Sequence, residues 1–166
     1  MERLWAPWRL AYVTRASTDI TTDCIFCDAC EPGRDELVLV RGRVAYVILN
    51  LYPYNNGHLM VAPNRHVATL ASTTSDEQAE LMRYTRHAEI ALTEAYTPQG
   101  INIGLNLGRP AGAGVLDHLH VHLVPRWNGD TNFMTVVGNV RVLPETLDET
   151  AKRLKPIFER LARDDR

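Results

Sequence analysis

The segment at 117–127, DHLHVHLVPRW, contains three of the chain's six histidines and constrains the fold more than any other stretch. Successive side chains of a β-strand point to opposite faces of a sheet. In a strand the apolar residues of this segment would therefore lie on one face and His118, His120 and His122 on the other. Imidazole can act as a nucleophile, a proton donor or acceptor, or a metal ligand near neutral pH. We expect a sheet with one face in the core and one that carries chemistry.

Further strands are predicted before and after a long helical segment. Apolar runs predict strands at 36–40 (ELVLV), 43–50 (RVAYVILN) and 58–63 (HLMVAP), with a hairpin around Gly42. The alternating segment INIGLNL, at 101–107, predicts a strand with Asn102, Gly104 and Asn106 on a small polar face. The segment NFMTVV, at 132–137, predicts one more strand.

Two amphipathic helices are predicted from apolar residues that recur every three or four positions. The first begins at Ser75, whose spacing to Gln78 fits a capping box, and ends before the following proline. The second has a capping box at Thr146 and Glu149 and is expected to kink at Pro156. The order of strands, helix, strands and helix favours an α+β fold: an antiparallel sheet of about five strands with two main helices.

The length and composition are typical of one globular domain. The chain has 166 residues, of which 45% are hydrophobic and 23% charged, so it can bury a core of ordinary size. No repeat or linker interrupts it. We expect a single domain over 1–166, with a core at about 24–137, an N-terminal arm at 1–20 and a C-terminal helix at 146–163.

The charge balance argues against large anionic partners. Lys and Arg total 18 against 20 Asp and Glu, so no overall positive field attracts nucleic acid or an anionic membrane. The first residues lack the apolar run of a signal peptide, and no later stretch has the length of a membrane span. We therefore expect a cytoplasmic protein that binds neither nucleic acid nor membrane, with any phosphate site local.

Cys24, Cys27 and Cys30 lie together in the segment CIFCDAC. In a cytoplasmic chain, an odd number of closely spaced cysteines indicates metal or redox chemistry more than structural disulfides. A single CxxC cannot complete a tetrahedral zinc site, which needs two more ligands. The alternative is a set of reduced thiols in a partly exposed loop, and a redox CxxC is disfavoured because no βαβ pattern surrounds it.

The segment 118–124, HLHVHLV, resembles the signature of the histidine triad (HIT) superfamily. The segment ILNLYPYNNGHLMVAPNRHV, at 48–67, resembles the family's ribose-binding hairpin, and AGAGVLDHLHVHLVPRW, at 111–127, resembles its phosphate loop and catalytic strand. LWAPWR near the start, the CxxC and HLHVHLVPRWNGDTNF are similar to bacterial diadenosine tetraphosphate phosphorylases and related HIT nucleotide hydrolases. The resemblance runs from about Trp5 to Phe133 and implies a HIT-like fold paired across a homodimer.

The resemblance also implies roles for individual histidines. His120 would attack the α-phosphorus of a nucleotide to form a nucleotidyl-histidine intermediate. His122 would hydrogen-bond near the scissile bridge or leaving group, and His58 would support it from the neighbouring strand. His87 lies among charged residues of the first predicted helix, so we expect it to be exposed to solvent.

The nucleotide itself would be bound by residues on both sides of the triad. The resemblance places Asn50 at the ribose, Asn106 near the phosphates, and the backbone amides around Gly114 and Val115 at a phosphate cradle. Two more candidates come from their position at the end of the histidine strand: Arg126, which can bind phosphate, and Trp127, which follows it.

A structural zinc ion is implied as well, and no organic cofactor. Its ligands would be Cys24, Cys27, His66 and His118, with Cys30 a weaker substitute. That assignment leaves His120 and His122 for catalysis, so the metal and the reaction do not compete for the same imidazoles.

The implied reaction is phosphorolysis of dinucleoside polyphosphates such as diadenosine tetraphosphate. If water replaces phosphate as acceptor, the protein is a HIT nucleotide hydrolase acting on dinucleoside polyphosphates or nucleoside phosphoramidates. A nucleotide-binding protein with incidental turnover is the other alternative. The segment AGAGV departs from many hydrolases of the superfamily, which carry a glutamine and a hydroxyl residue there.

Overall fold

The computed structural model describes residues 24–31, 33, 36–113, 115, 117–130 and 144–165. The elements in these ranges are α2 (Ile25–Asp28), β1 (Val38–Arg41), β2 (Ala45–Leu49), β3 (Leu59–Pro63), η1 (Leu70–Ser72), α3 (Ser75–Tyr96), β4 (Gly100–Leu105), η2 (Arg109–Ala111), β5 (Val121–Arg126) and α5 (Leu147–Asp164). The predicted arm at 1–20 and the predicted strand at 132–137 lie outside the described residues. No helix in the described part of the chain combines the length and apolar character needed to cross a bilayer.

The five strands form one antiparallel sheet in the order β1-β2-β3-β5-β4. The predicted α+β fold, with about five antiparallel strands and two main helices, is therefore confirmed. β5 lies between β3 and β4, so His122 pairs with Met60 on one side and with Gly104 on the other. The histidine strand thus occupies an interior position, with residues from both neighbouring strands beside its side chains.

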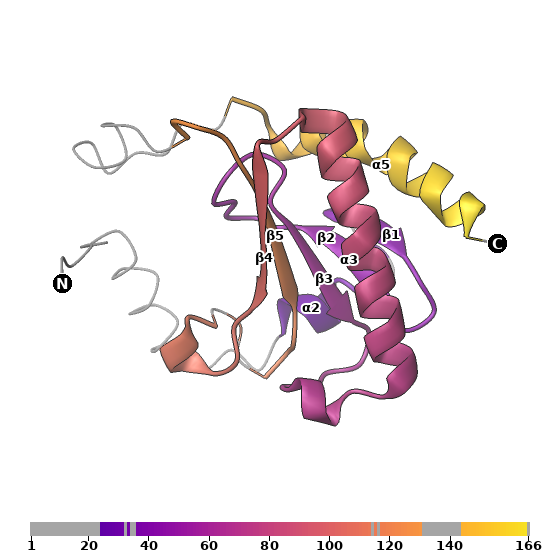
Figure 1. Ribbon diagram of the computed structural model, residues 1–166. Coiled ribbons are helices and arrows are strands. Elements are labelled where there is room, and N and C mark those ends of the chain that lie inside the picture. The colour runs from indigo at the N-terminus through magenta and orange to yellow at the C-terminus, as the bar shows by residue number, and fades with distance from the viewer. Residues whose placement is uncertain are drawn as a thin grey trace.

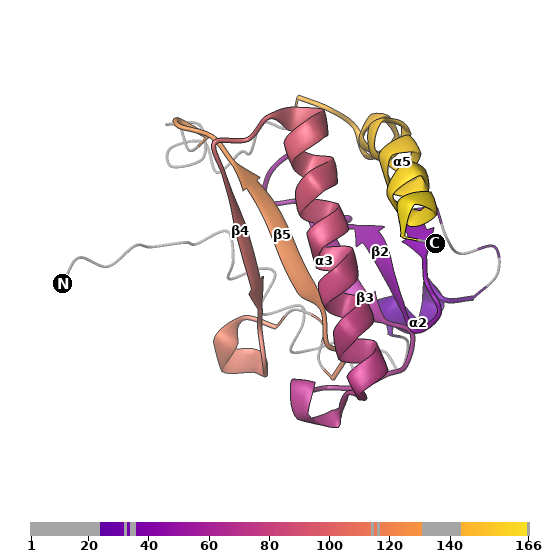
Figure 2. The ribbon, with the colours of Figure 1, turned by 45° about the vertical axis from the view of Figure 1, so that its right-hand side comes forward.

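The two faces of the sheet are covered by different helices (Figures 1 and 2). On one face, Ala45 and Val47 belong to the large core that includes residues of α3 and α5. On the other, Tyr46 and Ile48 join a smaller apolar cluster around Phe26 of α2. Because β2 is covered on both sides, all five of its residues are buried, which explains its continuous apolar run.

The ends of the helices correct one prediction and confirm another. The capping box of α3 is made by Thr74 and Glu77, so the predicted box at Ser75 was wrong by one residue. The Glu77 carboxylate accepts from Thr74 N at 2.7 Å and also binds Arg65, which fixes the helix start at this position. The box at Thr146 is confirmed, and α5 continues through its internal proline to Asp164.

His87 is buried, which contradicts the prediction of an exposed residue. Its side chain is 2% exposed, and its Nε2 lies 2.9 Å from an oxygen of Asp165. The charged neighbours of His87 in the sequence had suggested that it lies on the surface. Because α5 packs against α3, the C-terminal end of α5 covers His87 instead.

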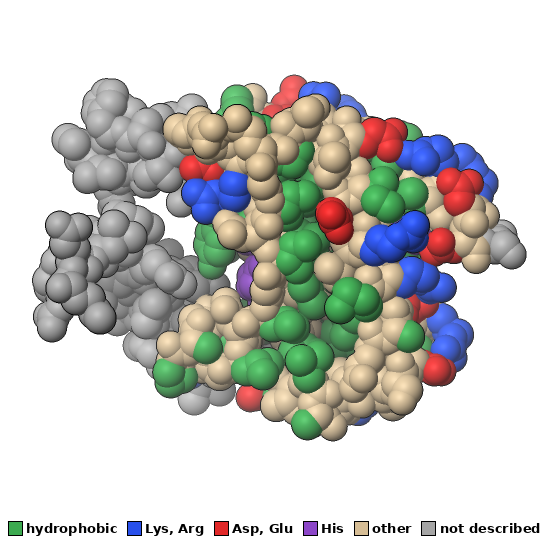
Figure 3. Space-filling model, in the orientation of Figure 1, with side chains coloured by type: hydrophobic (Ala, Val, Ile, Leu, Met, Phe, Trp, Pro, Cys, Tyr) green, Lys and Arg blue, Asp and Glu red, His purple; other side chains and the backbone are tan. Residues whose placement is uncertain are grey.

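Apolar side chains are exposed near β4 and on α3. Figure 3 shows hydrophobic side chains gathered between β4 and α3. Among the exposed large apolar residues, Ile103 of β4 is 46% exposed, Leu107 is 45% exposed and Met82 of α3 is 68% exposed. β4 is also an edge strand, with β5 as its only partner among the described residues.

Candidate functional site

His122 lies in β5, and His118 and His120 lie in the segment just before it, so the predicted histidine strand begins later than expected. The three imidazoles differ in their hydrogen bonds. His120 is 5% exposed, and its Nδ1 lies 2.8 Å from the carbonyl oxygen of His118. A carbonyl can only accept, so Nδ1 carries the proton and Nε2 keeps its lone pair. Burial lowers the pKa of His120, which favours this neutral imidazole. The result is an imidazole with a basic, nucleophilic Nε2.

His122 has the opposite tautomer, which is fixed by a chain of hydrogen bonds from the β2–β3 loop. Tyr54 N donates to His58 Nδ1 at 3.0 Å, so the proton of His58 is on Nε2. His58 Nε2 lies 3.0 Å from His122 Nδ1 and donates to it. His122 therefore carries its own proton on Nε2 and presents a donor.

The electrostatic environment keeps His122 neutral as well. Burial, and to a smaller extent the neighbouring His120, lower the pKa of His122 to about 4. The site thus pairs a neutral acceptor, His120 Nε2, with a neutral donor, His122 Nε2. Such a pair suits nucleophilic attack on a phosphorus atom, with a hydrogen bond donated to the oxygen that leaves.

Two aromatic side chains hold these imidazoles in place. Phe26 of α2 packs on the ring of His120, with centroids 4.6 Å apart, and on the ring of His118 at 5.1 Å. Tyr54 packs on His58 at 4.7 Å. Neither aromatic residue was predicted for the site, because each reaches it from a different segment of the chain. Burial between rings and strands restricts the orientations open to each imidazole.

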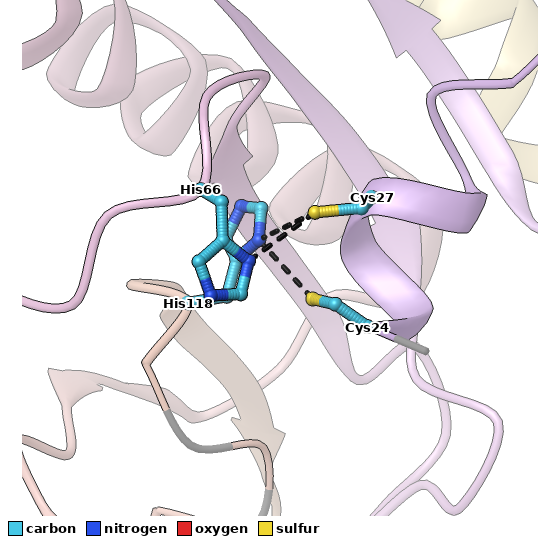
Figure 4. A group of neighbouring side chains, drawn as sticks. All are labelled: Cys24, Cys27, His66 and His118. Carbon is cyan, nitrogen blue, oxygen red and sulfur yellow. Dashed lines mark hydrogen bonds between the residues drawn. The ribbon is translucent and has the colours of Figure 1, made fainter. Parts of the chain in front are cut away.

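A second cluster brings two thiols and two imidazoles together (Figure 4). Cys24 Sγ lies 3.3 Å from His118 Nδ1, and Cys27 Sγ lies 3.2 Å from His66 Nδ1. The four ligand atoms all lie within 4.8 Å of one another. The four predicted metal ligands therefore meet at one point, and Cys30 is not part of that group.

The donor set of this cluster fits zinc. Zn–S bonds of about 2.3 Å and Zn–N bonds of about 2.0 Å in a tetrahedron place S and N ligands about 3.5 Å apart. His118 Nε2 donates to the carbonyl oxygen of Pro63 at 2.9 Å, so its Nδ1 points a lone pair at the sulfurs. Burial and the Cys24 side chain raise the pKa of the Cys27 thiol to about 11, so a compensating cation is needed to make it a thiolate.

The predicted nucleotide-binding residues fall into two groups. Asn50 lies at the triad: its Oδ1 accepts from Tyr52 N at 2.9 Å and its Nδ2 lies 3.3 Å from His58 Nδ1. Asn106 and Val115 instead line a cavity of about 320 Å³ beside His118. Gly114, the centre of the predicted phosphate cradle, lies outside the described residues.

Arg126 is bonded to protein groups at the end of β5. Its Nε and Nη2 donate to Asp130 at 2.6 and 2.9 Å, and its Nη1 donates to Asn102 Oδ1 at 3.0 Å. Trp127 is half-buried, and its backbone N–H donates to Asp130 at 3.2 Å. The sequence prediction missed Asp130, although its spacing of four residues from Arg126 across an Asn-Gly turn was visible.

Comparisons with known proteins agree with this geometry. Residues 33–129 match the HIT domain family. An AP-4-A phosphorylase of Mycobacterium tuberculosis is 42% identical over 161 residues, which cover 93% of this chain and 83% of that protein.

Two solved structures share the fold. A hypothetical histidine triad nucleotide-binding protein of Sulfolobus tokodaii is 28% identical, with a TM-score of 0.68 over 85% of this chain and 95% of that one. A Zn-bound histidine triad family protein of Mycobacterium smegmatis is 27% identical, with a TM-score of 0.66 over 87% of this chain and 96% of that one.

Proposed function

This chain belongs to the HIT domain family, and from that premise we propose that it cleaves dinucleoside polyphosphates such as diadenosine tetraphosphate by phosphorolysis. One observation carries the proposal. His120 and His122 lie on one face of the sheet in opposite tautomers, with one nitrogen ready to attack and another ready to donate. The 42% identity to an AP-4-A phosphorylase supports the choice of substrate and acceptor.

The first step transfers a nucleotidyl group to the protein. The lone pair of His120 Nε2 attacks the α-phosphorus, and the bond from that phosphorus to its bridging oxygen breaks. His122 Nε2–H donates a hydrogen bond to the bridging oxygen and so stabilises the negative charge that develops there as the nucleoside polyphosphate leaves as an anion. Because a polyphosphate is already a good leaving group, we assign most of the rate to positioning and charge stabilisation.

The second step releases the nucleotide. An oxygen of inorganic phosphate attacks the nucleotidyl phosphorus, the P–N bond breaks, and its electron pair returns to His120 Nε2. Any proton released by the incoming phosphate passes to solvent, and His122 keeps its own proton through both steps. With diadenosine tetraphosphate the two steps together yield ATP and ADP.

The surface beside the triad has room for a phosphate chain. Gly104 of β4 pairs with His122, so both residues face the same side of the sheet. A Cβ atom added at Gly104 would meet no other atom within 4 Å. The Asn50 side chain lies against His58 at the other edge of this surface, where it can bind the ribose. Substrate would therefore lie between the β2–β3 loop and β4.

The cluster of Cys24, Cys27, His66 and His118 is assigned to a structural zinc ion. Its donor set and spacing support that assignment, as does the Zn-bound relative. When bound, the cation would supply charge compensation for two thiolates and a link between α2 and the loops around it. The chain's own contribution is to carry Phe26 of α2 onto the ring of His120.

A second copy of the chain is the partner assigned to the apolar surface at β4. Within the described ranges, one edge of β4 has no partner strand, and such an edge can add a strand from another chain; the exposed Ile103 and Leu107 supply apolar area on and just after β4. We expect a homodimer in sedimentation analysis and a shift to monomer in an Ile103→Lys variant. A wild-type protein that sediments as a monomer would contradict this part of the proposal.

Product analysis tests the reaction. The purified protein is incubated with diadenosine tetraphosphate with and without inorganic phosphate, and the nucleotides are separated by chromatography. ADP and ATP appearing only with phosphate is the expected result. AMP and ATP appearing regardless of phosphate would replace phosphorolysis with hydrolysis, and no product under either condition would contradict the enzyme.

A further inference from the structure

Asp130 lies at the centre of a hydrogen-bonded group at the end of β5. Its side chain is 9% exposed and its carboxylate binds both Nε and Nη2 of Arg126. The same carboxylate accepts from Trp127 N at 3.2 Å and from Asn55 Nδ2 at 3.0 Å. A bidentate Arg–carboxylate pair is among the stronger and more directional polar contacts in proteins. Asp130 thus joins residues that are far apart in the sequence.

Asn55 is the contact that connects this group to the triad. It lies in the loop at 50–58 between β2 and β3, and its Nδ2 also donates to the carbonyl oxygen of Pro125 at 3.0 Å. The same loop contains Asn50, at its start, and His58, at its end. His58 N donates to the carbonyl of Asn55 at 3.2 Å, so Asn55 and His58 are directly linked.

The first residues of the loop have little apolar packing, whereas Gly57 and His58 at its end are buried. Leu51 is 54% exposed and Tyr52 is 71% exposed. Segments with few buried apolar contacts open at low free energy unless polar contacts hold them. The bonds of Asn55 to Asp130 and to Pro125 supply such contacts, and Arg126 extends them to Asn102 on β4.

We propose that Asp130 is a positioning residue, which clamps the loop at 50–58 against the end of β5 and so holds Asn50 and His58 in register with His122. The effect of the clamp on substrate binding rests on the proposed function, whereas its effect on the position of the loop does not. In that function, Asn50 binds ribose and His58 fixes the tautomer of His122, so loosening the loop weakens nucleotide binding first. Arg126 acts through Asp130 and is not a direct ligand of the phosphate chain.

A matched control lies elsewhere in the chain. Glu145 is 10% exposed and binds Arg153, which is 53% exposed. The exposed fractions are similar in the other pair, at 9% for Asp130 and 47% for Arg126. Glu145 also accepts from Tyr96 and Thr150, so it too joins several segments. It lies beside α3 and α5, whose residues pack on the face of the sheet opposite the triad.

The kinetic test compares Asp130→Ala, Asn55→Ala and Glu145→Ala. We expect KM for diadenosine tetraphosphate to rise about tenfold in the first two with kcat changed less than about threefold, and neither constant to change in the control. The double variant N55A/D130A should raise KM by less than the product of the two single effects, because both substitutions remove the Asn55–Asp130 contact. Additive effects, or an equal rise of KM in the Glu145→Ala variant, would overturn the clamp.

Amide hydrogen exchange supplies a readout that needs no turnover. Exchange at residues 50–56 should quicken in both D130A and N55A and stay unchanged in E145A; residues 57 and 58 are left out of the comparison because Tyr96, a partner of Glu145, lies against Gly57. Unchanged exchange in this loop would overturn the clamp even if KM rose. If wild-type protein cleaves no dinucleotide, the proposed function fails, while exchange still decides the clamp. N55A keeps the carboxylate, so it provides the test should D130A fold poorly.

Discussion

His118 and His120 lie two residues apart on the same face of the sheet, yet they belong to different sites. His118 donates through Nε2 to Pro63 and turns Nδ1 towards the sulfurs of α2. His120 donates through Nδ1 to the carbonyl of His118 and keeps Nε2 as its basic nitrogen. The alternating pattern places both imidazoles on one face. In each ring, the nitrogen that donates to a backbone carbonyl carries the proton, so the other nitrogen is available for chemistry.

The surroundings of the two clusters differ in the same way. The metal cluster takes its partners from α2 and the loop after β3, and those partners include thiols. The triad cluster takes its partner His58 from the start of β3, where Tyr54 and Asn50 fix its tautomer. Under the proposed function, one cluster holds a cation and the other carries out the reaction. Each of the following predictions tests that division.

Removal of the nucleophile should have the largest effect. We expect His120→Gly to lower turnover by at least about 10³-fold, since no other group can form the covalent intermediate. Nucleotide binding, measured by calorimetry, and bound zinc should both persist. Activity within tenfold of wild type would assign the nucleophile to another residue and contradict the proposed division of roles between the two clusters.

Removal of a metal ligand should affect stability more than chemistry. We expect Cys24→Ser to lose bound zinc and to lower Tm by roughly 10 °C, because ligand binding free energy is also folding free energy. The matched control is Cys30→Ser, in the same motif but outside the ligand group. Metal analysis and thermal unfolding of both variants decide the point, and equal loss of zinc in the control would contradict the assignment.

Removal of His58 should slow the reaction by a smaller factor. We expect His58→Ala to lower kcat about 10- to 100-fold, because the proton of His122 is then no longer fixed on Nε2. A His58→Gln variant should recover part of the rate, since the glutamine amide can also donate to His122. No difference in kcat between these two variants would show that His58 contributes only to packing.

Acid should destabilise the triad by a modest amount. The pKa of His122 is lowered from 6.5 to about 4, chiefly by burial. Below pH 6.5 this histidine becomes protonated in the unfolded chain but stays neutral in the folded chain. The free energy of unfolding therefore falls as the pH drops from 6.5 to about 4, and this group has no effect on it above pH 6.5. We expect Tm of wild type to fall roughly 3 °C more than that of His122→Asn between pH 7 and pH 5. Parallel pH profiles would show that His122 titrates normally.

The sequence was informative about faces and less so about contacts that depend on packing. Alternation at 118–123 correctly predicted that Leu119, Val121 and Leu123 enter the core, although β5 begins only at Val121 and so contains His122 but not His118 or His120. The four members of the thiol–imidazole cluster were named correctly as neighbours, but through resemblance rather than spacing, because His66 and His118 come from separate loops.

What could not be predicted depends on which segments meet in three dimensions. The burial of His87 follows from the position of α5, which no local pattern specifies. The pairing of Arg126 with Asp130 could not be predicted either, because it depends on how the chain turns after β5. The tautomers of His58 and His122 depend on the amide of Tyr54, whose place is set by the path of the loop.

The most direct test of the division between the two clusters is to locate the covalent intermediate. A single turnover with diadenosine tetraphosphate, without inorganic phosphate, is quenched in alkali, where a phosphoramidate bond survives, and the peptides are analysed by mass spectrometry. A nucleotidyl adduct on His120, with His118 unmodified, is the predicted result. An adduct on His118 or His122, or turnover in which ATP forms with no adduct at all, would contradict the account.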